Sequence, residues 1–341
     1  MWILLMCWIL TSCITIQSVP IDLLEPGKVP IPPSVRKVAI IARNFKFSVD
    51  TLGDYFKQDF LLRKGSKKDN ELIDSLSVTK SLEGIRKSLL ESGRFDEVFV
   101  YPFDAIKSHV AEKELPLTHE FIGSVCRESQ TDAVISLEML SFFYSCHKGT
   151  SGQDIQPGAN VKVTAIWAVY TPQSDGPIDR YTHPETMRWK EGKLESDGRY
   201  YKLPERKEAI SIACNEAAKN YSKRIVPHWI ESSRVIIGSN DPELDKAVSY
   251  GQNNKWEAAG SIWLKFSKSP NTRIAGISSL NYAVAQEMLG DLELALEWSD
   301  KSVKLLQGGE AGKIAREYAA VLYQRKLKAS SLNEVLKVRQ K

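Results

Sequence analysis

Apolar runs alternate with amphipathic stretches through about the first two thirds of the chain. Residues 38–41 form a short run with β-branched side chains that predicts a buried strand. Residues 79–93 carry apolar positions at helical spacing and predict a helix with Thr79 as its N-cap, and the charged residues 64–70 before it are expected to form a loop. The same order returns with a helix predicted over 118–129 and a strand over 132–143. Such alternation predicts a sheet with helices packed on it, which is an α/β or α+β sandwich.

A stretch with apolar residues at alternate positions follows. Every second position from Val161 to Val169 is apolar, which is typical of a strand with one covered face. Residues 178–190 are expected to return as its antiparallel partner, and a helix is expected over 205–224. We therefore place a first domain over residues 35–236. Its order of elements resembles the small α/β domains of envelope lipoproteins of the curli-secretion type.

The last third of the chain matches itself at a step of 36 residues. Small residues recur at this step, where two helices of a hairpin would approach closely: Ala247, Ala259, Ala283 and Ala295. The pattern resembles the tetratricopeptide repeat, most closely over residues 281–298. The resemblance implies an all-α module over 237–341, with two repeats and a capping helix. Asp241 and Pro242 are expected to begin its first helix.

The N-terminus is almost entirely apolar over residues 1–16. This run is shorter than the roughly 20 residues that a membrane-spanning helix needs, and it suits the apolar region of an export signal. Within it, residues 10–13 read Leu-Thr-Ser-Cys, which resembles the lipobox of bacterial lipoproteins. The resemblance implies a signal peptide over 1–12 and a lipid on Cys13. The Lys or Arg that usually precedes the apolar region is absent.

Prolines dominate the segment that follows Cys13. Five of them between Pro20 and Pro33 predict an extended tether over 13–34, which would lift the folded part off the bilayer. Acidic residues do not cluster after Cys13, which favours a position in the cell envelope on the outer membrane, facing the periplasm. Taken whole, residues 23–33, residues 227–234 and the paired repeats resemble a family of uncharacterised lipoproteins from Bacteroidetes. That resemblance implies no known activity.

Charge and motifs exclude several functional classes. A formal net charge of +4 over 341 residues is small, whereas proteins that bind nucleic acid usually concentrate a basic excess. The five histidines show no pair at i, i+4 and there is no Cys-x-x-Cys, so we expect no metal and no cofactor. Adjacent Cys146 and His147 would point to opposite faces of a strand, which does not suit a nucleophile and its base. We therefore expect no catalytic residues.

Two functions remain open. The leading hypothesis is a non-enzymatic envelope lipoprotein, an adaptor or scaffold that binds an envelope protein or peptide in a groove of its repeats. On the tetratricopeptide resemblance, the groove positions are Leu280, Val284, Glu287, Met288, Arg316 and Tyr323. The alternative is a small-ligand-binding protein or enzyme. It would use a pocket of the α/β domain near the strand ends, around Arg43, Asn44 and Glu138.

Overall fold

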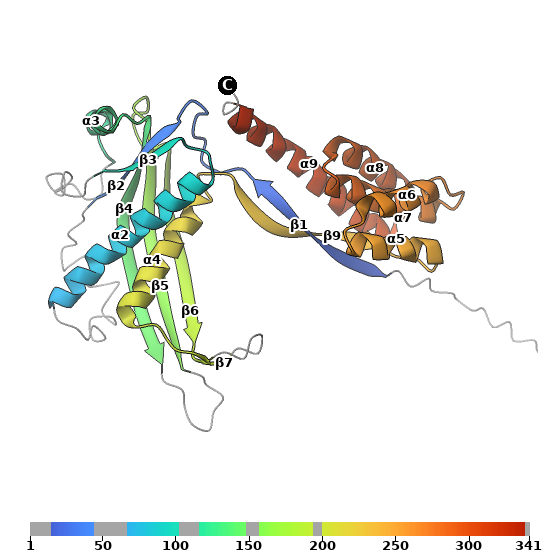
Figure 1. The fold of residues 1–341 in the computed structure, drawn as a ribbon. Helices are drawn as coiled ribbons and strands as arrows, with labels where there is room; N and C mark the ends of the chain where they lie inside the picture. Colours follow the sequence, from blue (N-terminus) through green and yellow to red (C-terminus); the bar gives the residue numbers. More distant parts are fainter. Residues whose placement is uncertain (1–14, 44–66, 102–115, 148–156, 194–199, 338–341) are drawn as a thin grey trace, which may run out of the picture. The chain divides into compact units, whose positions relative to one another are not determined.

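A computed structural model describes residues 15–43, 67–101, 116–147, 157–193 and 200–337. The chain divides into two compact units (Figure 1). The first consists of Gly27–His228 with Val335–Lys341, and the second of Met1–Pro26 with Trp229–Glu334. A mixed sheet and helices make up the first unit, and helices make up most of the second. The predicted order of an α/β region and then an all-helical region is confirmed.

The α/β unit is built on a five-stranded sheet in the order β3-β2-β4-β5-β6. Its strands are β2 (Lys37–Ala42), β3 (Glu97–Val100), β4 (Ala133–His147), β5 (Gly158–Tyr170) and β6 (Asp179–Lys190). Strand β2 runs parallel to both of its neighbours, β3 and β4, whereas β5 runs antiparallel to β4 and to β6. A short pair of strands, β7 (Gly192–Lys193) and β8 (Tyr200–Tyr201), lies outside this sheet.

Helices cover both faces of the sheet. Helices α2 (Lys67–Glu91) and α4 (Arg206–Ser222) lie side by side on one face, and α3 (His119–Ser129) packs on the other (Figure 1). Neighbouring residues of a strand point to opposite faces. Thus Ile40 of β2 shares a core cluster with residues of α2, and Ile41 shares one with residues of α3. The prediction of a buried strand over residues 38–41 is confirmed, and the strand is covered on both faces.

The two helix starts predicted in this unit have different outcomes. Thr118 caps α3 as a threonine should, because its side chain accepts a hydrogen bond from the backbone N–H of Phe121. Thr79 is no cap, because α2 begins at Lys67 and the Thr79 hydroxyl donates to the carbonyl of Ser75 inside the helix. The charged stretch over 64–70 was predicted as a loop, and this is wrong from Lys67 onward.

The helical unit contains five consecutive helices. They are α5 (Pro242–Gln252), α6 (Trp256–Phe266), α7 (Thr272–Met288), α8 (Leu292–Leu305) and α9 (Gly309–Lys337). Successive helices from α5 to α8 pack against each other. Asp241 caps α5 through hydrogen bonds from the N–H groups of Glu243 and Leu244, and Pro242 stands in the first turn, as predicted. Helix α7 is the most buried of the five along its length.

A two-stranded ribbon completes the helical unit. Strand β1 (Ile16–Glu25) pairs with β9 (His228–Ile237), and the Gly238 N–H donates to the Thr15 carbonyl at 2.7 Å, so the strands run in opposite directions. Val19 is buried in the same core as the helices. The predicted tether is therefore wrong over residues 16–25. The alternation of apolar residues there outweighs the prolines, and exposed Pro20 is tolerated in a ribbon strand.

Candidate functional site

An extended segment of the chain occupies the place where we expected a partner to bind. The end of β9 lies in one core cluster with α7, where Ile236 and Ile237 are buried together with Leu280 and Val284. The Asn281 side chain holds the backbone of Ile237: its Oδ1 accepts from the Ile237 N–H at 2.9 Å and its Nδ2 donates to the Ile237 carbonyl at 2.7 Å. Leu280 and Val284 are core residues, so their predicted exposure in a groove is wrong.

Glu287 is likewise internal. Its side chain is 0% exposed, and it accepts hydrogen bonds from Nε and Nη2 of Arg234 at 2.7 and 2.8 Å and from the Tyr318 hydroxyl at 2.9 Å. Arg325 of α9 donates to the same carboxylate. Burial acts to raise the pKa of Glu287, but the bonds and charges of the two arginines outweigh it and lower the pKa. Glu287 therefore joins β9, α7 and α9, and the neighbouring Met288 packs half-buried against this core.

Helix α9 carries the two predicted groove residues that reach solvent. Arg316 and Tyr323 are exposed, and they share one side of the helix with Ala320 and Leu327, because these residues are spaced by three or four positions. We call these four residues the α9 stripe. The Tyr323 hydroxyl donates to Oδ2 of Asp300 at 2.8 Å, and Leu327 is 65% exposed. The predicted groove is thus divided between the core and this stripe.

The predicted lipidation site, Cys13, lies outside the described residues. Within them, no helix is both long enough and apolar enough to cross a membrane. Cys126 and Cys214 are buried, Cys146 is exposed, and all three thiols are free. Burial raises the pKa of the Cys214 thiol to about 12, so this side chain behaves as a small hydrophobe.

The strand ends of the α/β unit hold a buried polar cluster. Arg43 follows β2, and Glu138 stands at a bulge in β4 where the register with β5 shifts. The two form an ion pair with only 8% and 3% of their side chains exposed, and the Tyr170 hydroxyl donates to Glu138 at 3.1 Å. Burial, with the charge of Glu138, raises the pKa of Tyr170 to about 12. Asn44 lies outside the described residues. Arg43 and Glu138 are brought together as predicted, but as a closed ion pair.

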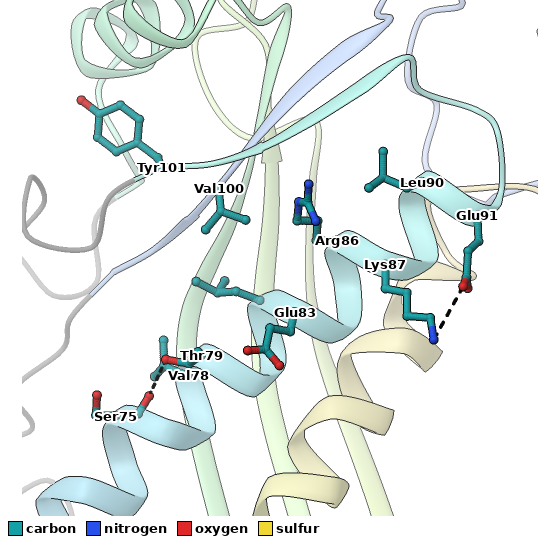
Figure 2. A pocket seen from close by; sticks show the side chains of 11 residues that line it. Ser75, Val78, Thr79, Glu83, Arg86, Lys87, Leu90, Glu91, Val100 and Tyr101 are labelled. Carbon is teal, nitrogen blue, oxygen red and sulfur yellow. Dashed lines mark hydrogen bonds and ion pairs between the residues drawn. The ribbon is translucent and has the colours of Figure 1, made fainter.

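A cavity of about 720 Å³ opens elsewhere in this unit, between α2 and the end of β3 (Figure 2). Apolar side chains including Val78, Leu82 and Val100 line it, together with charged residues of α2 such as Arg86 and Lys87. Its volume lies within the range of roughly 300–1,000 Å³ that ligand pockets occupy. We call this space the α2–β3 cavity.

No group of three or more His, Cys, Asp or Glu residues suited to a metal ion occurs among the residues described. His183 of β6 is half-buried, its Nε2 lies 3.6 Å from Glu185 Oε2, and its ring contacts that of Tyr221. Burial lowers the pKa of His183 more than Glu185 raises it. The His183 imidazole therefore takes up a proton less readily than an exposed histidine does.

We expect the α/β unit to lose stability as the pH falls below about 6.5, the ordinary pKa of histidine. The pKa of His183 is lower in the folded state than in the unfolded state. As the pH falls, the unfolded chain therefore takes up the proton first, which favours unfolding. Urea unfolding of the full chain at pH 7 and pH 5 measures this effect. His183→Gln should reduce the difference between the two pH values. If the loss of stability between pH 7 and pH 5 is the same in His183→Gln, other titratable groups cause it.

Two family models match the chain, one over most of the α/β unit and one over the helices of the helical unit. A family model described as Domain of unknown function (DUF8603) matches residues 35–236, which is more than half of the chain. The chain belongs to the DUF8603 family. A second model, Domain of unknown function (DUF6340), matches residues 245–329. No curated protein matches the chain.

The two matches enclose different candidate sites. The DUF8603 region contains the five-stranded sheet, the pair of Arg43 with Glu138 and the α2–β3 cavity, and it ends inside β9. The DUF6340 region contains Glu287 and the α9 stripe. Strand β1 lies outside both matches, although Val19 completes the core of the helical unit.

Proposed function

We propose that this chain is a non-enzymatic interaction protein of the bacterial cell envelope, anchored by lipid on Cys13 to the outer membrane and facing the periplasm. Its helical unit, in this proposal, consists of two tetratricopeptide-like repeats and a capping helix that bind an envelope protein. The lipobox at residues 10–13 supports the anchor. The 36-residue step supports the repeats, because it relates the helix pair α5–α6 to the pair α7–α8.

The exposed α9 stripe carries the proposal. Leu327 is 65% exposed and Tyr323, one turn away, is 48% exposed. Tyrosine and arginine are among the residue types that contribute most to protein interfaces, and the exposed leucine adds apolar surface next to the tyrosine. Since β9 occupies the groove itself, we place the partner on the outer side of α9, where Arg316 flanks the apolar pair.

Leu327→Glu tests this placement. A charge within the apolar part of the interface should reduce recovery of a specific envelope partner by about tenfold. The substitution should leave the stability of the chain within about 0.5 kcal/mol, because Leu327 already faces water. The measurement is quantitative pull-down of the full-length lipidated protein from crosslinked envelopes.

Val321→Glu is the matched control. Val321 is 43% exposed on the same helix, but six positions from Leu327 it faces roughly 120° away. Partner recovery should be unchanged in this variant. If Leu327→Glu and Val321→Glu recover the same amount of partner, whether that amount is normal or reduced, the α9 stripe is not the contact.

A further inference from the structure

The α2–β3 cavity has an apolar interior. Strand β3 lies at the edge of the sheet, and α2 passes beside its end, so that one flank of the helix faces this space (Figure 2). Leu82 is 7% exposed and lines the cavity with half-buried Val78 and Val100, and Leu90 stands at its margin, 37% exposed. These side chains offer a surface for the hydrocarbon part of a ligand.

Among the described charged residues that line the cavity, one cation has no acidic partner. Glu83 pairs with Lys80 at 2.7 Å, and Glu91 pairs with Lys87 at 3.7 Å. Arg86 uses its Nε to donate to the backbone carbonyl of Val98 at 3.3 Å, and within the described part of the chain it has no carboxylate partner. In Figure 2 its guanidinium projects from α2 toward β3, beside Val100.

Guanidinium chemistry indicates which head group would complete the cavity. The planar fork of arginine has five N–H donors and matches a carboxylate in a bidentate arrangement. Among the described residues, the carbonyl of Val98 is the one acceptor that these donors reach. We propose that the α2–β3 cavity binds a fatty acid, with its carboxylate on Arg86 and its hydrocarbon chain on Val78, Leu82 and Val100. This site is independent of the α9 stripe and requires no catalysis.

Decanoate is the probe, titrated calorimetrically into the full chain below the concentration at which it forms micelles, with decanol as the neutral comparison. Saturable binding of one decanoate is expected, with an affinity about fivefold higher than that of decanol. Arg86→Gln should lower the affinity for decanoate to that for decanol and leave decanol unaffected. Lys207→Gln removes an exposed cation of α4 that does not line the cavity, and it should change neither affinity.

Thr79→Trp separates this cavity from other apolar surfaces. Thr79 is exposed and lines the cavity, so the indole should fill the space without disturbing the core, and binding of both probes should be lost. Absence of saturable decanoate binding to the unaltered chain, or binding that persists in Thr79→Trp, would overturn the site. Equal affinity for decanoate and decanol would overturn the assignment of a carboxylate ligand.

Discussion

Replacing Glu287 with alanine will lower the free energy of unfolding of the helical unit by about 3–5 kcal/mol. The carboxylate is fully buried between Arg234 and Arg325, and Tyr318 donates to it as well. Its removal leaves two guanidinium groups without their counter-charge, and Arg234 is only 5% exposed. An unpaired buried charge costs much more than the loss of one hydrogen bond. Urea unfolding and hydrogen exchange of α7 measure the effect.

Glu293→Ala is the control for Glu287→Ala. Glu293 pairs with Lys326 at 2.7 Å, but its side chain is 73% exposed, so the change in the free energy of unfolding should stay within about 1 kcal/mol.

The stabilising effect of Glu287 should also depend on pH. Because the folded-state pKa of Glu287 is lowered, its contribution is present above pH 4.5 and is lost as the pH falls through that lowered pKa. Full stability of Glu287→Ala together with loss of partner binding would restore the predicted groove.

Val19→Asp is expected to destabilise the helical unit by about 3 kcal/mol or more, although Val19 lies at the other end of the chain from the helices. The side chain is 2% exposed and belongs to one core cluster with Ile236, Leu280 and Trp263. A carboxylate at this position would be buried among apolar atoms. Denaturant unfolding of the full chain, followed by helix content, gives the change.

Ser18→Asp adds the same carboxylate at the exposed neighbouring position of β1, so its effect should stay within about 0.5 kcal/mol. A large difference between the two variants shows that β1 is part of the helical unit. Equal stability of the two would mean that this segment is the extended tether first expected from its prolines.

Local signals made much of the fold predictable. A threonine before an amphipathic stretch identifies the start of α3, and Asp241 with Pro242 identifies the start of α5, because caps act over three or four residues. The start of α2 was missed because residues 67–78 are rich in polar and charged side chains, which suit a loop and an exposed helix equally.

The contacts around Glu287 that the sequence did not predict join residues far apart in the chain. The repeat pattern locates Glu287 on the first helix of a hairpin, but nothing local indicates that Arg234 supplies its counter-charge or that Asn281 binds the backbone of Ile237. A signal did exist: β9 ends in three consecutive aliphatic residues, Val235–Ile237, which require burial. The sequence shows that this segment must be covered, whereas only the fold shows that α7 covers it.

Partner binding through α9 should be tested by substitution within the full chain. Truncation before Asp241 would remove the helices that bury Val19, Ile236 and Ile237, so its effects would mix loss of binding with loss of folding.

Site-specific photo-crosslinking in cells tests the central claim most directly. A benzophenone amino acid replaces Leu327 in the full chain, and a second strain carries it in place of Val321 on another side of α9. We predict a discrete crosslinked envelope protein from position 327 that is absent from position 321. No adduct at position 327, or the same adducts from both positions, would contradict the proposal that the α9 stripe binds a partner.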